Sequence, residues 1–340
     1  MDSAFIKYIL RRLLFLIFLL FGVTLAVFII THMVPANPAA AYLTPEAMSN
    51  PDVVAAFNAR WGLDKPLPVQ YFLYMKNLLS GDLGTSMRTK QPVLTDLMKY
   101  FPATVELSIT AMLFAAFFGI IFGIISATHP NSPLDQVLRA VSVSGVSVPT
   151  FWLSLVFLYL FYFKWKLLPG PGRLSSSIVF EPKTNLLLLD SLLAGNLEVF
   201  SDAFSHLLLP GMVLGCFSMG LITRTTRSSL MDVLSMDYIR TARSKGRSRS
   251  AVVREHAMKN ALVPVITVLG IGLCNLLGGV VLVEKIFSWP GVGQYAYLAA
   301  TSLDFPAISG VALLIALIYV LVNLVIDIIY AAIDPRVRYY

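Results

Sequence analysis

Charged side chains are scarce in this sequence, and their scarcity excludes a soluble globular protein. Only 13% of the 340 residues are Asp, Glu, Lys or Arg, while 57% are hydrophobic; an average soluble domain has roughly 25% charged residues. A chain with so few charges cannot cover a water-facing surface, so its class is a polytopic membrane protein. The net charge of +7 does not indicate nucleic-acid binding, because the basic excess lies in one loop and near the chain ends. We therefore expect the lipid bilayer, and no nucleic acid, as a partner.

Residues for catalysis or metal binding are also missing or scattered. The four histidines never form HExxH, and the two cysteines lie inside apolar runs, which excludes a disulfide framework. There is no Gly-x-Ser-x-Gly elbow of a hydrolase. No Gly precedes any Lys, so the Gly-Lys-Ser/Thr phosphate loop is absent. We predict that the chain is not an enzyme and holds no metal or cofactor, and that any ATP and Mg²⁺ are bound by partner subunits.

Long apolar runs are abundant, and six are long enough to cross a bilayer as helices. The runs cover Leu13–Ile30 and about Ala103–Thr128, Val137–Phe163, His206–Ile222, Ala261–Val283 and Ala307–Ile333. A signal peptide is the alternative for the first run, but that run is longer than a signal core. The fourth run is short and should tilt little. We predict an all-α membrane protein with six transmembrane helices and both termini in the cytoplasm.

Polar segments divide the chain into three expected parts. These are 1–100 with the first span and an external cap, 101–333 with five spans and a cytoplasmic loop at 223–260, and a cytoplasmic tail at 334–340. Prolines break the cap, in which short helices are expected at Pro51–Trp61 and Val69–Leu79. The loops Lys164–Ser205 and Glu284–Pro306 should then face outside.

The loop at 223–260 is strongly basic, with nine Lys or Arg residues against three Asp or Glu residues. A basic loop between spans stays in the cytoplasm. Asp237 should N-cap a short helix that ends near Gly246, and the apolar side of this helix should carry Tyr238, Ile239 and Ala242. A second helix should start at Ser250 and place Val253, Ala257 and Ala261 on one stripe. Such a pair of helices would fit a groove of another protein; a solvated loop that only fixes topology is the alternative.

The amino-acid sequence of this loop resembles a known docking segment. Asp237-Tyr-Ile-Arg-Thr-Ala-Arg-Ser-Lys-Gly246 and Asn260-Ala-Leu-Val-Pro264 are similar to the loop by which permeases of ATP-binding-cassette (ABC) importers dock on their ATPase. Arg240-Thr-Ala242 stand where the general signature has Glu-Ala-Ala, and the gap to Pro264 is longer than usual. Both departures are usual in the dipeptide/oligopeptide/nickel branch of these permeases. Segments of the cap and of the outer loops resemble the same branch, so the resemblance covers nearly the whole chain.

The resemblance implies a type I ABC importer permease fold and a role as the permease subunit of an ATP-driven, binding-protein-dependent importer of peptides, closest to the dipeptide type. Its partners would be a homologous second permease, two ATP-binding subunits and an extracytoplasmic substrate-binding protein, in the bacterial inner membrane. The coupling residues would be Asp237, Tyr238, Arg240, Thr241, Ala242, Lys245 and Gly246. The exact substrate stays open among dipeptides, oligopeptides, D-amino-acid dipeptides, glutathione and chelated nickel. The alternative class is an ion-gradient-driven secondary transporter, which would need intramembrane acids in matched halves.

Three further sets of residues are candidates for packing or function. An outer stretch resembles a signature of the peptide branch and would line the external gate or meet the binding protein; an interfacial aromatic anchor is the alternative. Its candidates are Glu284, Phe287, Trp289, Pro290, Gly291 and Gly293. Glu106, Asn323 and Asp327 are polar residues within the spans, where an ionisable residue indicates a functional site by default. The resembling permeases carry the same pattern at these positions whatever they transport, so the resemblance implies hydrogen bonding between helices rather than substrate contact. Small residues should allow close helix packing, namely Gly119, Gly123, Ser126, Gly270, Gly278 and Gly279.

Overall fold

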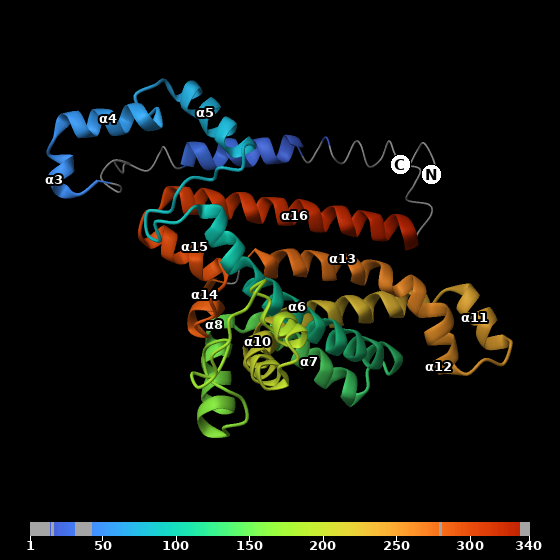
Figure 1. The fold of residues 1–340 in the computed structure, drawn as a ribbon. Helices are drawn as coiled ribbons and strands as arrows, with labels where there is room; N and C mark the ends of the chain where they lie inside the picture. Colours follow the sequence, from blue (N-terminus) through green and yellow to red (C-terminus); the bar gives the residue numbers. More distant parts are fainter. Residues whose placement is uncertain (1–13, 15–16, 31–42, 279–280, 334–340) are drawn as a thin grey trace. The chain divides into compact units, whose positions relative to one another are not determined.

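The fold was analysed from a computed structural model, which describes residues 14, 17–30, 43–278 and 281–333 (Figure 1). Over these residues the regular secondary structure is helical, apart from one isolated bridge between Thr85 and Pro92. The chain forms two compact units, one of Met1–Phe101 with Gln294–Val320 and one of Pro102–Gly293 with Leu321–Tyr340. This division differs from the expected parts, because a segment near the C-terminus groups with the N-terminal residues.

Four helical stretches are long and apolar enough to cross a membrane alone, and one bent pair of helices raises the number to five. The four are α6 (Val93–Thr128), α10 (Leu197–Leu234), the continuous stretch Arg249–Leu277, and α16 (Phe305–Ile333) over its residues Phe305–Ile326. The first expected span is described only as the short apolar helix Ile17–Ile30, and the residues before it lie outside the described part. A count of six spans therefore stays a prediction, as does the orientation of the termini.

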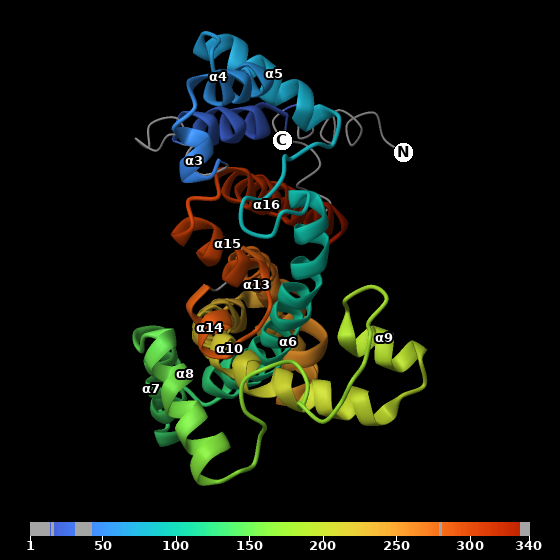
Figure 2. The same cartoon turned by 60° about the vertical axis from the view of Figure 1, so that its left-hand side comes forward.

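The expected span at Val137–Phe163 is not one continuous helix, because the chain bends by 108° within it (Figure 2). The segment consists of α7 (Pro133–Ser147), α8 (Thr150–Phe157) and the π-helix η1 (Leu158–Lys164). Pro149 has no N–H group for a helical hydrogen bond and disfavours the helical conformation of the residue before it. Val148 accordingly has extended backbone, with φ −80° and ψ 128°.

The prediction that the fourth span is short is wrong. It forms α10, a single helix of 38 residues that continues far beyond both ends of the expected run His206–Ile222. The side chain of Asn196 caps its start by accepting a hydrogen bond from the Val199 N–H group. Beyond Ile222 the helix carries charged residues, which ended the apolar run in the sequence but do not end the helix.

Helix α10 is the centre of its unit, where it contacts α7, α8, α13 and α9 (Leu187–Leu193) (Figure 1). Glycines bring the backbones close together. A Cβ atom at Gly119 or Gly123 of α6 would overlap Ile222 or Thr226 of α10, and one at Gly270 would overlap Ile326. The predicted close packing at these three glycines is confirmed. Ser126 instead hydrogen-bonds Asp135, Gly278 is the C-cap of the helix that it follows, and Gly279 lies outside the described residues.

The cap region of the other unit consists of α3 (Pro45–Met48), α4 (Pro51–Trp61) and α5 (Leu67–Leu79). Helix α4 has the predicted bounds: the Asn50 side chain caps its start, and Gly62 ends it in the left-handed conformation. Helix α5 begins two residues before the predicted start. Its Tyr71 and Tyr74 rings pack on Phe28 of the helix Ile17–Ile30.

Two buried carboxylates order the loop between α5 and α6 in the same unit. Asp304, just before α16, accepts hydrogen bonds from the Ser86 hydroxyl at 2.6 Å and from a backbone N–H at 3.2 Å. Asp96 accepts from the Thr89 hydroxyl at 2.6 Å and from the Tyr295 hydroxyl at 3.1 Å. Burial and, next, the neighbouring charge of Asp96 raise the pKa of Tyr295, which lies on α15 (Val292–Thr301).

Candidate functional site

The basic loop folds into two helices joined by a tight turn (Figure 1). Its elements are α11 (Asp237–Ser244), α12 (Arg249–Val252), the π-helix η2 (Val253–Ala257) and α13 (Met258–Leu277). Lys245 is the C-cap of α11, and Gly246 follows it with φ +77°, in the left-handed region that glycine adopts without strain. The turn therefore depends on a glycine at this position.

Two details of the predicted helix starts are wrong. Asp237 does not cap α11: it is the first helical residue, after Met236, which makes no side-chain cap hydrogen bond. Its carboxylate still lies where the positive end of the helix dipole favours a negative charge. The second helix begins at Arg249, one residue early, because the Ser248 hydroxyl accepts a hydrogen bond from the Ala251 N–H group.

An apolar cluster holds these helices on the rest of the chain. Ile239 of α11 is fully buried with Leu230 and Val233 of α10. Val253, Ala257 and Ala261 belong to the same cluster, which confirms the predicted stripe. The small-residue face of the pair thus packs against its own chain and is not free to enter a partner's groove. Ala242, a predicted coupling residue, is half-buried against this cluster.

The outer face of α11 is exposed and basic. The predicted coupling residues that lie exposed are Asp237, Tyr238, Arg240, Thr241, Lys245 and Gly246. The Arg240 side chain is 81% exposed, and its 3.7 Å contact with Asp237 is a surface ion pair that contributes little to stability. The Asn260 amide donates a hydrogen bond to the Tyr238 hydroxyl at 2.8 Å. The two parts of the docking-like segment, 22 residues apart in sequence, therefore meet.

A buried ion pair that the sequence analysis does not predict lies near the start of this loop. The Asp135 carboxylate at the start of α7 accepts hydrogen bonds from Arg227 Nε at 2.9 Å and Nη2 at 3.1 Å. It also accepts from the Ser126 hydroxyl and from the Asn131 N–H group at 2.9 Å. Asp135 is fully buried, so these bonds join α6, α7 and α10. Its position after Ser132-Pro133 indicates a helix start, but no local signal pairs it with Arg227, 92 residues away.

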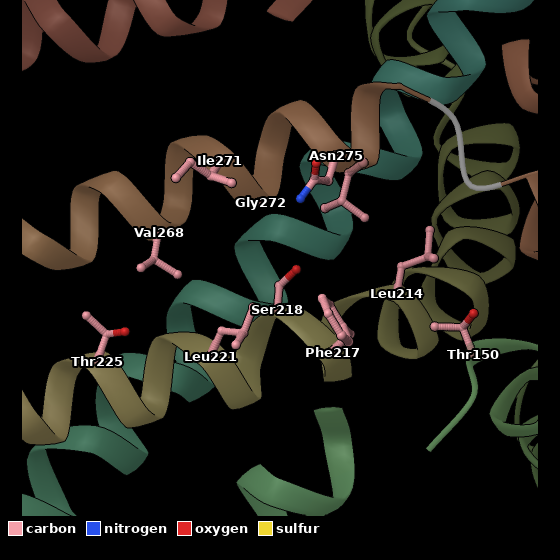
Figure 3. Close-up of a pocket in the computed structure, with 11 residues that line it drawn as sticks. Thr150, Leu214, Phe217, Ser218, Leu221, Thr225, Val268, Ile271, Gly272 and Asn275 are labelled. Atoms are coloured by element: carbon pink, nitrogen blue, oxygen red, sulfur yellow. The ribbon is translucent and has the colours of Figure 1, made fainter. Parts of the chain in front are cut away.

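A cavity of about 350 Å³ separates α10 from α13 further along the same two helices (Figure 3). Ser218 and Thr225 of α10 and Asn275 of α13 contribute polar groups to its wall, and Thr150 contributes from α8. Apolar side chains form the rest, and Val268 points from α13 toward α10 (Figure 3). None of the lining residues, all within the described part of the chain, is ionisable. In the sequence Thr150, Ser218 and Asn275 lie inside apolar runs, whereas Thr225 lies in the basic loop.

The outer candidate stretch is mostly buried. Glu284, in α14 (Val281–Ile286), is fully buried and accepts a hydrogen bond from the Thr104 hydroxyl at 2.8 Å. A Cβ atom at Gly291 or Gly293 would collide with its carboxylate. Phe287 is buried and Pro290 is half-buried. Trp289 is only 1% exposed, and its Nε1–H group donates a hydrogen bond to the Ala103 carbonyl at 2.8 Å. The alternative of an interfacial aromatic anchor is therefore wrong for Trp289, while a role at an external gate stays a prediction.

The polar residues predicted within the spans have different surroundings. Glu106 of α6 forms an ion pair with Arg173 and accepts a hydrogen bond from the Leu188 N–H group at 2.8 Å. These contacts tie the segment around α9 to α6 and occupy the carboxylate within the chain. Asn323 and Asp327 lie one turn apart on α16, but the side chain of Asp327 lies outside the described part. Their interaction stays a prediction.

Comparison with known proteins agrees with this architecture. Residues 119–339 match the family "Binding-protein-dependent transport system inner membrane component", and residues 5–108 match the family of the corresponding N-terminal part. The dipeptide transport system permease protein DppB of Alkalihalophilus pseudofirmus is 43% identical over 98% of this chain and 100% of that protein. The probable D,D-dipeptide transport system permease protein DdpB of Escherichia coli is 44% identical over 95% of this chain and 94% of its own length.

A solved structure shares the fold. An inward-facing conformation of the MetNI methionine ABC transporter superposes with a TM-score of 0.50 at 16% identity, over 71% of this chain and 97% of that one. At this identity the likeness establishes the fold alone. The predicted resemblance is confirmed: the chain belongs to the family of binding-protein-dependent transport system inner membrane components and is a multi-pass protein of the bacterial inner membrane.

Proposed function

We propose that this chain is one permease subunit of an ATP-driven importer of short peptides, with dipeptides as the substrate class. The names of its relatives support the substrate class. In the proposed complex a homologous permease completes the pore, two ATPase subunits bind ATP and Mg²⁺, and an external binding protein delivers the peptide. Six spans with both termini in the cytoplasm complete the proposed topology.

The observation that carries the proposal is the exposed basic face of α11 on a buried base. A partner that pushes on Arg240 or Lys245 acts on a helix whose Ile239 is locked among α10 residues. The push is therefore transmitted through this cluster to the start of α13, whose Ala261 belongs to it. ATP shifts the pore between two states by differential affinity, so α11 must pass its displacement on to a wall of the pore.

The cavity between α10 and α13 is the proposed segment of the peptide path. Both helices extend from the base of α11, so a displacement there changes the width of the cavity. Its wall offers hydroxyl and amide groups from Ser218, Thr225 and Asn275 but no charge. Such a wall hydrogen-bonds a peptide without holding either charged terminus in an ion pair, which favours passage over retention.

Uptake of a labelled dipeptide by cells that contain the complete transporter tests the proposal. Arg240→Glu should abolish uptake and leave the amount of subunit in the membrane unchanged, because this side chain contributes little to stability. The matched control is Lys76→Glu, an exposed basic residue on α5. Unchanged uptake by Arg240→Glu would refute the coupling role. The purified chain alone should hydrolyse no ATP, and turnover by it would refute the subunit assignment.

A further inference from the structure

A second cavity, of about 750 Å³, lies between the end of α6 and the segment that joins α12 to α13. Its apolar wall includes Ile124, Val253 and Met258, and its polar side includes His129, Arg249 and Arg254. None of these residues belongs to the exposed face of α11 or to the cavity between α10 and α13. The transport mechanism proposed above leaves this site without a role.

Basic groups and apolar groups occupy different levels at the two ends of the cavity. Arg249 and His129 lie at the ends of two membrane-span candidates, Val93–Thr128 and Arg249–Leu277. Ile124 and Met258 lie further inside these same spans, and Arg254 lies between the two levels. Arg249 and His129 therefore lie toward the water and Ile124 and Met258 toward the bilayer interior, which is the order of an anionic headgroup and an acyl chain.

The charges around the polar side are unbalanced. Arg249 donates to the Thr128 carbonyl at the end of α6, which fixes its guanidinium beside the cavity. Arg254 is 83% exposed and lies 3.8 Å from Glu255, but that carboxylate is shared with Arg247 at 3.4 Å. Two guanidinium groups thus share one carboxylate and the third has no carboxylate partner among these contacts, which leaves a net positive charge for an anionic ligand.

We propose that this cavity binds an anionic phospholipid, with the phosphate at Arg249 and Arg254 beside His129 and an acyl chain along Ile124, Val253 and Met258. Arginine forms strong charge-assisted hydrogen bonds with phosphate, and basic pockets between cytoplasmic ends of membrane helices bind anionic headgroups. Free phosphate would leave the apolar wall uncovered, and a zwitterionic lipid would leave the positive charge unbalanced. The ligand is therefore a lipid with net negative charge.

Native mass spectrometry of the full-length chain in detergent tests the proposal, with phosphatidylglycerol, phosphatidylcholine and inorganic phosphate as separate probes. Phosphatidylglycerol should stay bound and raise the unfolding temperature, whereas the other two probes should do neither. The double variant Arg249→Gln/Arg254→Gln should bind phosphatidylglycerol about 30-fold more weakly, since each basic group near the membrane contributes about fivefold. Lys259→Gln is the matched control, because Lys259 is exposed on the same stretch and does not line the cavity.

The apolar wall has its own test. Met258→Gln keeps the length of the side chain and every basic group, so it should weaken binding of phosphatidylglycerol through the acyl chain alone. Equal affinity of wild type and the double variant would overturn the proposal, as would equal binding of phosphatidylcholine or a loss as large in Lys259→Gln. Unchanged affinity in Met258→Gln would overturn the acyl-chain contact. These readouts require no transport, so they stand apart from the test of coupling.

Discussion

Replacement of Gly246 by Ala separates the coupling role of the turn from its contribution to stability. Gly246 and Gly81 have nearly the same backbone, with φ +77° and +82°, and nothing lies within 4 Å of a Cβ atom added at either position. A methyl group therefore collides with nothing, and the only cost is the left-handed conformation, about 1–2 kcal/mol for a residue with a Cβ. Both substitutions should lower stability by this same amount.

Their effects on transport should differ. The turn at Gly81 follows α5 in the cap, whereas the turn at Gly246 sets the direction of α11 relative to α12. A cost of 1–2 kcal/mol lowers the ratio of the native turn to its alternatives by about 5–30-fold. We expect dipeptide uptake to fall, by at most a factor in this range, in Gly246→Ala and to stay at the wild-type rate in Gly81→Ala. Gly246→Asn should retain more uptake than Gly246→Ala, since Asn adopts the left-handed region more readily.

The assay is initial uptake of labelled dipeptide in cells, divided by the amount of subunit in the membrane. The ATPase rate of the purified complex, with and without the binding protein, shows whether hydrolysis continues when uptake falls. Equal uptake in Gly246→Ala and Gly81→Ala would refute the reasoning. So would an Asn variant as impaired as the Ala variant, because backbone strain would then not be the cause.

Three further predictions concern buried polar groups. Asp135→Asn should lower the stability of the purified chain by about 3–5 kcal/mol, because it leaves the Arg227 guanidinium without its carboxylate. The control Glu255→Gln, at an exposed ion pair, should cost at most about 1 kcal/mol. Equal shifts in unfolding temperature for the two variants would contradict the role of the buried pair. Tyr74→Phe should raise stability by about 1 kcal/mol, because the Tyr74 hydroxyl is buried without a hydrogen bond. Tyr71→Phe should lower stability, because the Tyr71 hydroxyl lies 2.9 Å from a Thr hydroxyl. Unfolding temperatures in the opposite order would refute this prediction. Burial raises the pKa of Tyr74 to about 12, so ionisation of Tyr74 costs more free energy in the folded chain than in the unfolded chain. Stability is therefore lost as the pH rises from the usual Tyr pKa of about 10 toward 12. The loss of unfolding temperature between these pH values should be smaller in Tyr74→Phe, and an equal loss would count against it.

Features set by neighbouring residues were predictable from the sequence. Asn50 before Pro51 and the glycine at position 62 define both ends of α4, because a cap and a left-handed stop act within a few residues. Gly246 marks the end of α11 for the same reason. The buried stripe at Val253, Ala257 and Ala261 follows from helical periodicity.

Features set by distant residues were not predictable. The ion pair between Asp135 and Arg227 joins residues 92 positions apart, and each appears in the sequence as an ordinary solvated charge. The length of α10 is not predictable from the apolar run, because charged residues end that run whereas the helix continues past them with Thr226, Leu230 and Val233 buried. The bend at Pro149 had a local signal, but the apolar residues on both sides were joined into one run. The cavity at Ser218 and Asn275 exists only when two helices are placed side by side.

The packing of α10 indicates which helix must move when the cavity between α10 and α13 changes width. The backbone of α10 lies in close contact with α6 and with α7, because a Cβ atom at Gly123 or Gly220 would overlap the facing helix. Neither the α6–α10 interface nor the α7–α10 interface can therefore slide unless the helices first separate. In the interface with α13, Val265 is fully buried in a cluster with Met219 and Ile222 of α10, and the cavity interrupts the contact further along. Helix α13 also begins from the π-helix η2 and contains Pro264, two features that weaken its hydrogen bonds near the base of α11. Helices α6, α7 and α10 therefore form the fixed block, and α13, hinged near Pro264, is the wall that a push on α11 displaces.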